Sequence, residues 1–320
     1  MITTYTTSFQ SFLTELSIKK EPKNLYEPIA YILGIGGKRI RPSLTLMACE
    51  LFGKPHTEAL NAALCVEMFH NFSLIHDDIM DNAPLRRGHE TVHEKWNLNT
   101  GILSGDALLI LACQQLNGYD GKVFKQLNGL FYTTALEVCE GQQYDFDFEQ
   151  RVDVSVEDYL KMIRLKTAVL LAASLKFGAI VAEANEDDMH GIYTFGLNLG
   201  MAFQLQDDYL DIFGTDNFGK QKAGDIISNK KTYMVLKTLA LVNEKERETM
   251  KYWFATTAYS EEKIRVISKL IKSYKVDLLV QNEIAKYTQQ AMQNVKELKI
   301  PEERKKTLND FATNLMLRKI

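Results

Sequence analysis

The sequence predicts an all-α protein, on the strength of two patterns that run through most of the chain. Apolar residues recur at helical spacing over much of the 320 residues, and the alternating pattern of strands is nearly absent. Of the six prolines, Pro84 alone lies between residues 56 and 300, and proline is costly inside a helix. No linker or low-complexity tract interrupts the chain, so we expect a single domain over residues 1–320.

Caps, breaks and apolar spacing define the expected elements. Thr57 can cap a long helix after the break at Pro55, and Ser155 begins a variant of the capping box. Pro301 marks a helix start, since proline suits the first helical turn. The expected helices are residues 8–20, 24–34, 43–52, 57–81, 100–117 and 122–144, one after 155, one ending at 211, and amphipathic helices within 243–318. We find no motif that carries chemistry in residues 243–318.

Composition excludes several classes of protein. The net charge of −3 creates no field that favours nucleic acid. The four cysteines are scattered and fit no zinc spacing, which indicates a reduced, cytoplasmic chain. Residues 1–12 lack the basic-then-apolar pattern of a signal peptide. No run of 18 uncharged apolar residues predicts a membrane span.

A first carboxylate cluster, Asp77, Asp78 and Asp81, ends a long apolar segment. A helix places positions four apart on one face, so Asp77 and Asp81 project the same way. Like charges at this spacing destabilise a helix and no basic residue lies among them, so we expect a counter-charge. A hard divalent cation with oxygen ligands fits, and an acidic helix end on the surface is the alternative.

The same Asp-Asp-x-x-Asp form recurs as Asp207, Asp208 and Asp211, again after an apolar segment. Apolar helices bury their faces, so two such helices can face each other across a pocket. Magnesium prefers one or two carboxylates together with water and phosphate oxygens, and two clusters therefore suit several ions that grip a diphosphate. Neither copy has the alternating ligands and central glycine of an EF-hand.

Arginines and glycines accompany the first cluster. Glycines at 34, 36 and 37 precede three cations within residues 38–41. A loop of this composition can approach a bound anion closely, and an ordinary solvated turn is the alternative. Arg86 and Arg87 follow the cluster, and arginine forks match phosphate oxygens. An ion pair back to the aspartates is the alternative for both arginines.

Further basic residues suggest a second anion site. Lys166 lies in an apolar helix, where its ammonium group needs a partner. An anionic ligand would be one, and the alternative is that the side chain extends along the helix until the ammonium group reaches water. His70 lies about two turns before Asp77 on a similar face, which favours the pocket over a core position. The glycine-rich segment 213–226 resembles a flexible phosphate-closing loop, and Lys230 follows it at the next helix start.

Together these motifs resemble those of the trans-isoprenyl diphosphate synthases, the head-to-tail polyprenyl synthetase family. The resemblance covers most of the chain, from residue 36 to at least 231. The matching motifs are Gly-Gly-Lys-Arg-x-Arg-Pro at 36–42, His70 through Asp81, Arg86-Arg87-Gly88, Lys166-Thr167, Phe203-Gln204-x-x-Asp207-Asp208-x-x-Asp211 and Phe218-Gly219-Lys220. The resemblance implies an all-α bundle around a deep central cavity, usually in a homodimer.

The resemblance also implies roles for the matched residues. Asp77 and Asp81 would bind two Mg²⁺ ions on the allylic diphosphate and Asp207 a third, for about three ions per site. Asp78 and Asp211 would support them. The residues implied to contact the allylic substrate are Arg86, Lys166, Thr167, Gln204, Lys220 and Lys230. Those implied to hold the diphosphate of isopentenyl diphosphate are Lys38, Arg41, His70 and Arg87.

The implied reaction is a head-to-tail prenyl transfer. The allylic carbon–oxygen bond ionises, and metal ions and fixed cations, here Lys166 and Arg86, stabilise the charge on the leaving diphosphate. The allylic cation meets the double bond of isopentenyl diphosphate, and the released diphosphate is a suitable acceptor for the departing proton. The cavity must exclude water, which would quench the cation.

Product length is expected to depend on the helix before the first cluster. Ser73 and Phe72 lie four and five positions before Asp77, and Phe69 lies one turn deeper. In the family an aromatic near this position stops the growing tail, although both phenylalanines could equally be ordinary core residues. One aromatic beside a small Ser73 resembles geranylgeranyl diphosphate synthases, so we expect a twenty-carbon product. The first alternative is a farnesyl diphosphate synthase, and the second is a long-chain polyprenyl synthase.

Two other functions are considered. A class I terpene cyclase shares the implied fold and the first cluster, but cyclases usually carry Asn/Asp-x-x-Ser/Thr-x-x-x-Glu where this chain has residues 207–211. A catalytically silent partner subunit would be free to lose aspartates, whereas all six are present here.

Overall fold

The computed structural model describes residues 2–16, 18, 20–214, 223–256 and 260–317. The protein is 81% helical, which confirms the predicted all-α class. A short antiparallel hairpin that the sequence did not predict joins β1 (Leu85–Arg86) to β2 (His89–Glu90). Within the described ranges, no helix is long and apolar enough to cross a membrane.

The chain divides into two compact units, each of which is described separately. The first comprises Met1–Ala135 with Ala173–Tyr193, and the second comprises Leu136–Ala172 with Thr194–Ile320. The helices α7 (Gly121–Gln150), α9 (Val169–Val181) and α10 (Glu186–Phe213) contribute residues to both units. The single domain expected over residues 1–320 stays a prediction.

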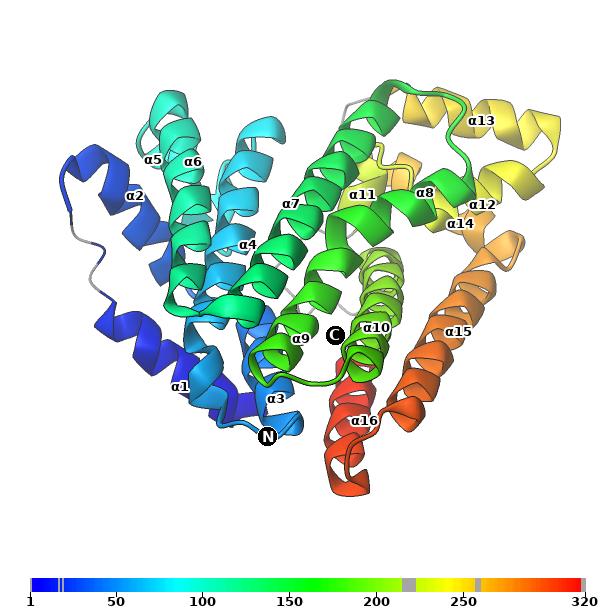
Figure 1. The fold of residues 1–320 in the computed structure, drawn as a ribbon. Helices are drawn as coiled ribbons and strands as arrows, with labels where there is room; N and C mark the ends of the chain where they lie inside the picture. Colours follow the sequence, from blue (N-terminus) through cyan, green and yellow to red (C-terminus); the bar gives the residue numbers. More distant parts are fainter. Residues whose placement is uncertain (1, 17, 19, 215–222, 257–259, 318–320) are drawn as a thin grey trace. The chain divides into compact units, whose positions relative to one another are not determined.

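The first unit is built around α4 (Leu60–Met80). Buried side chains lie on most sides of α4, as expected of a helix that is apolar nearly all round. The helix packs against α6 (Leu98–Gln115), which runs beside it in Figure 1, and against α3 (Ile40–Leu51). The other elements of this unit are α1 (Ile2–Glu15), α2 (Lys23–Gly34), η1 (His56–Ala59), α5 (Val92–Lys95) and η2 (Leu116–Gly118).

Several boundaries differ from those expected. Helix α1 covers Ile2–Glu15 rather than 8–20, because Tyr5, Phe9 and Leu13 form a buried stripe with a spacing of four. Thr57 does not cap α4, because Pro55 is followed by the 3₁₀ turn η1 and the residue before α4 is Ala59. Helix α7 continues to Gln150, beyond the expected end at 144.

The second unit has its own apolar core. Helices α12 (Tyr233–Leu241), α14 (Glu261–Ser273) and α15 (Val276–Glu297) pack on one another. The capping box at Ser155 is confirmed, since Ser155 and Asp158 exchange side-chain-to-backbone hydrogen bonds. The remaining elements are α8 (Val156–Ile163), the π-helical turn η3 (Arg164–Ala168), α11 (Gly224–Ile227), α13 (Glu244–Phe254) and α16 (Glu302–Met316).

A glycine lets two helices of the first unit approach closely. A Cβ atom at Gly178 in α9 would lie 2.1 Å from the carbonyl oxygen of Thr45 and 2.7 Å from the nitrogen of Cys49, both in α3. The Thr45 hydroxyl also donates a 2.8 Å hydrogen bond to the carbonyl of Ser174. Backbone atoms cannot move away as a flexible side chain can, so the contact requires glycine.

Gly178→Ala should therefore lower the free energy of unfolding by about 1–3 kcal/mol, the usual cost of overpacking a core. Gly34→Ala is the matched control, because a Cβ there meets no atom within 4 Å. Denaturant unfolding followed by circular dichroism measures both variants. Equal stability of the two variants would contradict the close approach of α9 to α3.

Candidate active site

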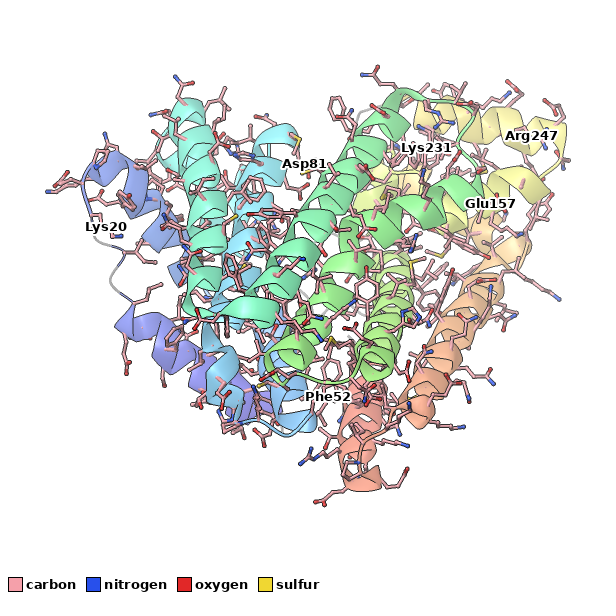
Figure 2. The ribbon with its side chains drawn as sticks, in the orientation of Figure 1. Lys20, Phe52, Asp81, Glu157, Lys231 and Arg247 are labelled. Atoms are coloured by element: carbon pink, nitrogen blue, oxygen red, sulfur yellow. The ribbon has the colours of Figure 1, made fainter. Side chains whose placement is uncertain are left out.

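The first aspartate cluster lies at the C-terminal end of α4. Asp77 and Asp78 belong to the last turn, and Asp81 follows as the capping residue, with its amide 2.8 Å from the Asp77 carbonyl oxygen. Figure 2 labels Asp81 at this end of the helix. The side chain of Asp78 is 2% exposed, whereas that of Asp77 is 20% exposed and Asp81 is exposed. One carboxylate of the cluster is thus buried, and two can be reached from outside.

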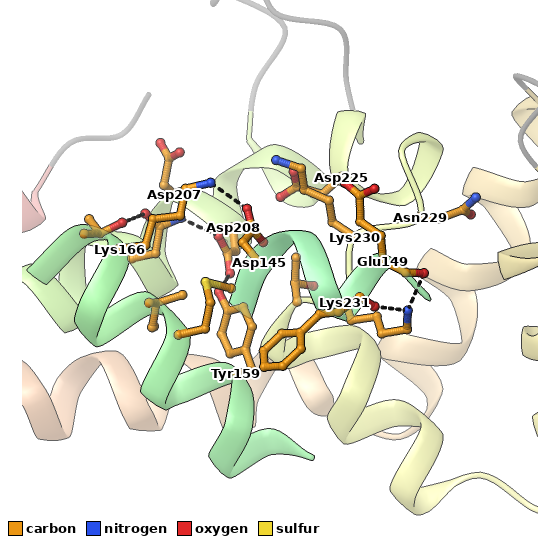
Figure 3. A pocket seen from close by; sticks show the side chains of 16 residues that line it. Asp145, Glu149, Tyr159, Lys166, Asp207, Asp208, Asp225, Asn229, Lys230 and Lys231 are labelled. Carbon is orange, nitrogen blue, oxygen red and sulfur yellow. Dashed lines mark hydrogen bonds and ion pairs between the residues drawn. The ribbon is translucent and has the colours of Figure 1, made fainter. Parts of the chain in front are cut away.

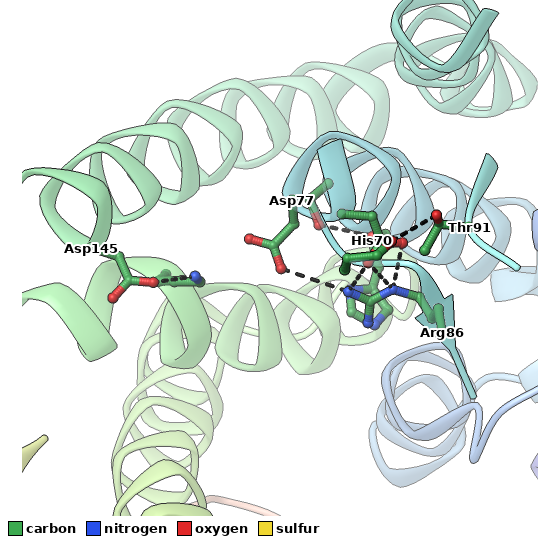
Figure 4. Close-up of polar contacts among 9 residues, drawn as sticks. His70, Asp77, Arg86, Thr91 and Asp145 are labelled. Carbon is green, nitrogen blue, oxygen red and sulfur yellow. Dashed lines mark hydrogen bonds and ion pairs between the residues drawn. The ribbon is translucent and has the colours of Figure 1, made fainter. Parts of the chain in front are cut away.

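Arg86 on β1 supplies the counter-charge for the buried carboxylate. Its Nε donates to both oxygens of Asp78 at 2.7 and 2.8 Å, and its Nη2 lies 2.6 Å from Asp78 Oδ1. The same Nη2 lies 3.8 Å from Asp77 Oδ2 (Figure 4). Thr91 steadies the hairpin by donating to the Ala83 carbonyl at 2.8 Å. The ion pair considered as an alternative for Arg86 is therefore present.

Arg87 contacts the glycine loop instead. Its Nη1 donates to the carbonyl of Gly36. A Cβ atom at Gly37 would lie 2.5 Å from Arg87 Nη1, and Gly37 has a φ of +132°, which L residues rarely adopt. The positive φ therefore favours glycine at position 37, whereas the flexible end of the Arg87 side chain can move away from a Cβ atom. Lys38 follows in this loop and is exposed.

A buried ion pair that the sequence analysis missed anchors this loop. Arg39 pairs with Glu67 of α4 and also donates to the carbonyl of Leu33. Asn71 donates to Glu67 Oε1 at 3.1 Å. Arg39 is 5% exposed and Glu67 2% exposed, and buried charges of this kind need a partner. The pair ties the loop to α4, and the signal for it was a lone glutamate inside an apolar helix.

Arg41 and His70 meet, as the prediction of a shared site requires. Arg41 Nη1 lies 3.2 Å from His70 Nε2. A guanidinium group can only donate, so Nε2 accepts and the imidazole is neutral with its proton on Nδ1. Burial, together with the positive charge of Arg41 and its neighbours, lowers the pKa of His70 well below its usual value of 6.5. His70 therefore orients Arg41 without adding charge.

The second cluster borders a cavity of about 250 Å³ within the second unit (Figure 3). Asp208 is 4% exposed and accepts from the Tyr159 hydroxyl and, at 2.9 Å, from Gln204. Thr167 donates to the other end of the Gln204 amide at 3.1 Å. Burial raises the pKa of Tyr159 well above 10, so its hydroxyl stays a donor. The middle aspartate is again buried and paired, while Asp207 lines the cavity.

Lys166 and Thr167 lie in the π-helical turn η3, which the sequence did not reveal. Such turns are rare and often occur at functional sites. Gly141 of α7 allows the turn to pack closely, since a Cβ there would lie 2.3 Å from the Lys166 nitrogen. Lys166 Nζ lies 2.5 Å from Asp145 Oδ2. Asp145 is therefore a protein partner for Lys166, and neither alternative considered from the sequence included it.

Asp211 binds the backbone of residues 223–225, at the start of α11. The amides of Gly224 and Asp225 donate to its two carboxylate oxygens at 3.2 and 3.1 Å, and its carbonyl accepts from Ala223 at 2.8 Å. This arrangement fits the supporting role expected for Asp211. Phe218, Gly219 and Lys220 lie outside the described residues, so the assignment of Lys220 stays a prediction.

Lys230 and Lys231 line the same cavity. Lys231 Nζ donates to the carbonyls of Phe148 and Glu149, the latter at 3.1 Å. These carbonyls end α7, where the helix dipole favours a cation. The segment that carries both lysines is thus tied to α7.

The expected length-determining residues form an aromatic cluster in the first unit. Phe69 is 1% exposed, and its ring lies 5.6 Å from that of Phe72. Phe131 of α7 packs edge-on against Phe69 at 5.5 Å, a third ring that the sequence did not indicate. Ser73 donates to the carbonyl of His70 at 2.8 Å.

Among the described residues, no group of three His, Cys, Asp or Glu side chains is placed to hold a metal ion.

Comparison with known proteins identifies the class. Residues 22–271 match the polyprenyl synthetase family model, and the chain belongs to this family. The chain is therefore an isoprenyl diphosphate synthase, and enzymes of this class join isopentenyl diphosphate to an allylic diphosphate with the help of Mg²⁺. The fold expected from the resemblance, that of all-α isoprenoid synthases, is confirmed.

Named relatives agree with this class. A geranylgeranyl diphosphate synthase of Saccharolobus solfataricus is 37% identical over 288 residues, which cover 88% of this chain and 86% of the relative. A short chain isoprenyl diphosphate synthase of Methanothermobacter thermautotrophicus is 39% identical over 72% of this chain and 71% of its own. A crystal structure of a geranylgeranyl pyrophosphate synthase matches with a TM-score of 0.95 and 49% identity, covering 100% of this chain and 99% of that one.

The lowered pKa of His70 predicts a loss of stability on the acid side. Below about pH 6.5 a histidine in the unfolded chain binds a proton, whereas partly buried His70, with its lowered pKa, stays neutral in the folded protein, so unfolding is favoured as the pH falls. This single group should reduce the free energy of unfolding by about 1.4 kcal/mol per pH unit. His70→Gln should remove that component. Unfolding at pH 7.5 and pH 5.5 measures it, and an equal acid loss in both proteins would show that His70 titrates normally.

Proposed function

We propose that this enzyme extends an allylic diphosphate with isopentenyl diphosphate and releases all-trans geranylgeranyl diphosphate. The observation that carries the proposal is the repeated Asp-Asp-x-x-Asp, with a buried, paired middle aspartate in both copies. The twenty-carbon length is supported by the relatives named as geranylgeranyl diphosphate synthases and by the aromatic cluster of Phe69 and Phe72, which precede Asp77 on α4. A farnesyl diphosphate synthase is the second candidate.

The donor atoms of the clusters suit magnesium. Asp77 and Asp81 carry carboxylates that are not fully buried, Asp207 lines the cavity, and Mg²⁺ takes few protein carboxylates together with water and phosphate oxygens. We assign two ions to Asp77 and Asp81 and a third to Asp207. When bound, these ions would stabilise the negative charge that develops on the leaving diphosphate.

The side chains of the protein divide between the two substrates. In the second unit, Lys166, Thr167, Gln204 and Lys230 line one cavity, which supports their assignment to the allylic diphosphate. Arg86 and Lys220 complete that set in our proposal. In the first unit, Arg41 and His70 are in contact and Arg87 is held on the glycine loop, which supports their assignment, with Lys38, to isopentenyl diphosphate.

We also propose a cytoplasmic homodimer. Helix α6 exposes large apolar side chains, among them Leu103 (60%) and Ile110 (59%), which are seven residues apart and therefore share a face. Sedimentation velocity tests the homodimer, and a monomer at working concentration would refute it.

The cytoplasmic location is supported by the cysteines. Cys49, Cys65, Cys113 and Cys139 carry no disulfide, which suits a reducing compartment.

Asp77→Asn and Asp207→Asn should each reduce kcat by at least about 100-fold, because each removes charge stabilisation that acts in the transition state. Asp120→Asn is the control, since Asp120 is exposed and lies outside both clusters. Steady-state assays with isopentenyl diphosphate, farnesyl diphosphate and Mg²⁺ measure the effect. Near-normal turnover of both cluster variants would exclude the proposed metal sites.

Phe72→Ala should lengthen the product by one or more isoprene units if Phe72 forms the floor of the product site. Phe69 would then become the next barrier, so the double variant Phe72→Ala/Phe69→Ala should go further. Chromatography of the dephosphorylated products decides between the possibilities. An unchanged length distribution in both variants would mean that other residues set the floor.

A further inference from the structure

A buried lysine outside every recognised motif contacts the segment that lines the diphosphate cavity. Lys263 lies in the first turn of α14 and is 0% exposed. It occupies the buried stripe of an otherwise amphipathic helix, four residues before Ile267 and eight before Ile271, which are also buried. An apolar residue is expected at such a position, since a buried lysine is costly unless its ammonium group is satisfied. A charge that breaks the apolar pattern calls for a specific reason.

The contacts of Lys263 supply that reason. Its Nζ donates to the Asn229 side chain, to the Ile227 carbonyl at 3.4 Å and to the Thr256 carbonyl at 3.2 Å. The Ile227 carbonyl ends the short helix α11, and Thr256 follows α13. Asn229 also donates to the Thr256 carbonyl at 3.2 Å, so the lysine and the amide share this acceptor. One ammonium group therefore joins α14, α11, the end of α13 and the turn at Asn229.

The turn at Asn229 is directly connected to the cavity. Asn229 has a φ of +59°, in the left-handed region, and asparagine tolerates this region better than most residues. Asn229, Lys230, Lys231 and Thr232 all line the cavity (Figure 3). Lys230 follows the turn immediately, with its amide bonded to the Asp225 carbonyl at 2.9 Å. A change in the turn would therefore move Lys230 relative to the other cavity residues.

We propose that Lys263 is a positioning residue for the diphosphate site: its buried ammonium group fixes the Asn229 turn and thereby holds Lys230 in place at the cavity wall. The proposal rests on the function proposed above, because it assumes that the cavity receives the allylic diphosphate. It needs no contact between Lys263 and substrate. Lys231 also anchors the segment, because it is bonded to the end of α7.

The test compares Lys263→Met, which keeps an unbranched side chain one atom shorter than lysine and removes its charge, with Lys269→Met. Lys269 is exposed on the same helix and is the matched control. Lys263→Met should raise KM for the allylic diphosphate about tenfold, because the released turn would cost Lys230 a charge-assisted hydrogen bond to that substrate. KM for isopentenyl diphosphate should stay within about twofold, and Lys269→Met should match the parent enzyme. A purely structural role would lower the amount of active enzyme and leave both KM values unchanged, which would overturn the proposal.

A second variant keeps the proposal testable if Lys263→Met does not fold. Asn229→Gly retains the left-handed turn and removes the amide that Lys263 holds. It should reproduce the selective rise in KM for the allylic diphosphate. If Lys263→Met does fold, the effects of the two substitutions in the double variant should be less than additive, because the two residues act through one contact. An Asn229→Gly enzyme with parental KM values would refute the proposal. An inactive parent protein would instead refute the proposed function.

Discussion

Each aspartate cluster depends on one buried carboxylate that is satisfied from within its own unit. Asp78 is held by the guanidinium of Arg86, and Asp208 by the Tyr159 hydroxyl and the Gln204 amide. An unpaired carboxylate in such surroundings would cost several kcal/mol, so these partners are conditions for folding each cluster. The buried aspartate fixes the end of its helix, and the neighbouring carboxylates of Asp77 and Asp207 are placed by it.

Several charged groups serve to position others. The Arg39–Glu67 pair ties the glycine loop to α4, and neutral His70 orients Arg41. Lys231 anchors the segment after the second cluster to the end of α7. In each case the partner is a backbone carbonyl, a buried carboxylate or an imidazole, which holds the group in a defined place. Charged groups held in this way need little reorganisation when they bind an anion such as a diphosphate.

The fold class and the family could be predicted from the sequence, because helical spacing and a repeated aspartate motif are local signals, while the metal chemistry of the clusters stays a prediction. The ion pair of Arg86 with the first cluster was considered as an alternative, but the other partners could not be predicted, because they depend on contacts between distant segments. Asp145 beside Lys166 and Tyr159 beside Asp208 are ordinary residues in their own helices. The π-helical turn at Lys166 packs closely against Gly141, a contact between distant segments that the sequence did not reveal. Lys263 did leave a signal, a charge within an apolar stripe, in a region where the sequence showed no motif.

The most direct test of the account is the reaction itself. Purified protein is incubated with Mg²⁺, farnesyl diphosphate and isotopically labelled isopentenyl diphosphate, and the products are dephosphorylated and separated by chromatography. The account predicts a labelled linear alcohol of twenty carbons, formed only when metal is present. A cyclised hydrocarbon that forms without isopentenyl diphosphate, or no incorporation of label by folded protein, would contradict it.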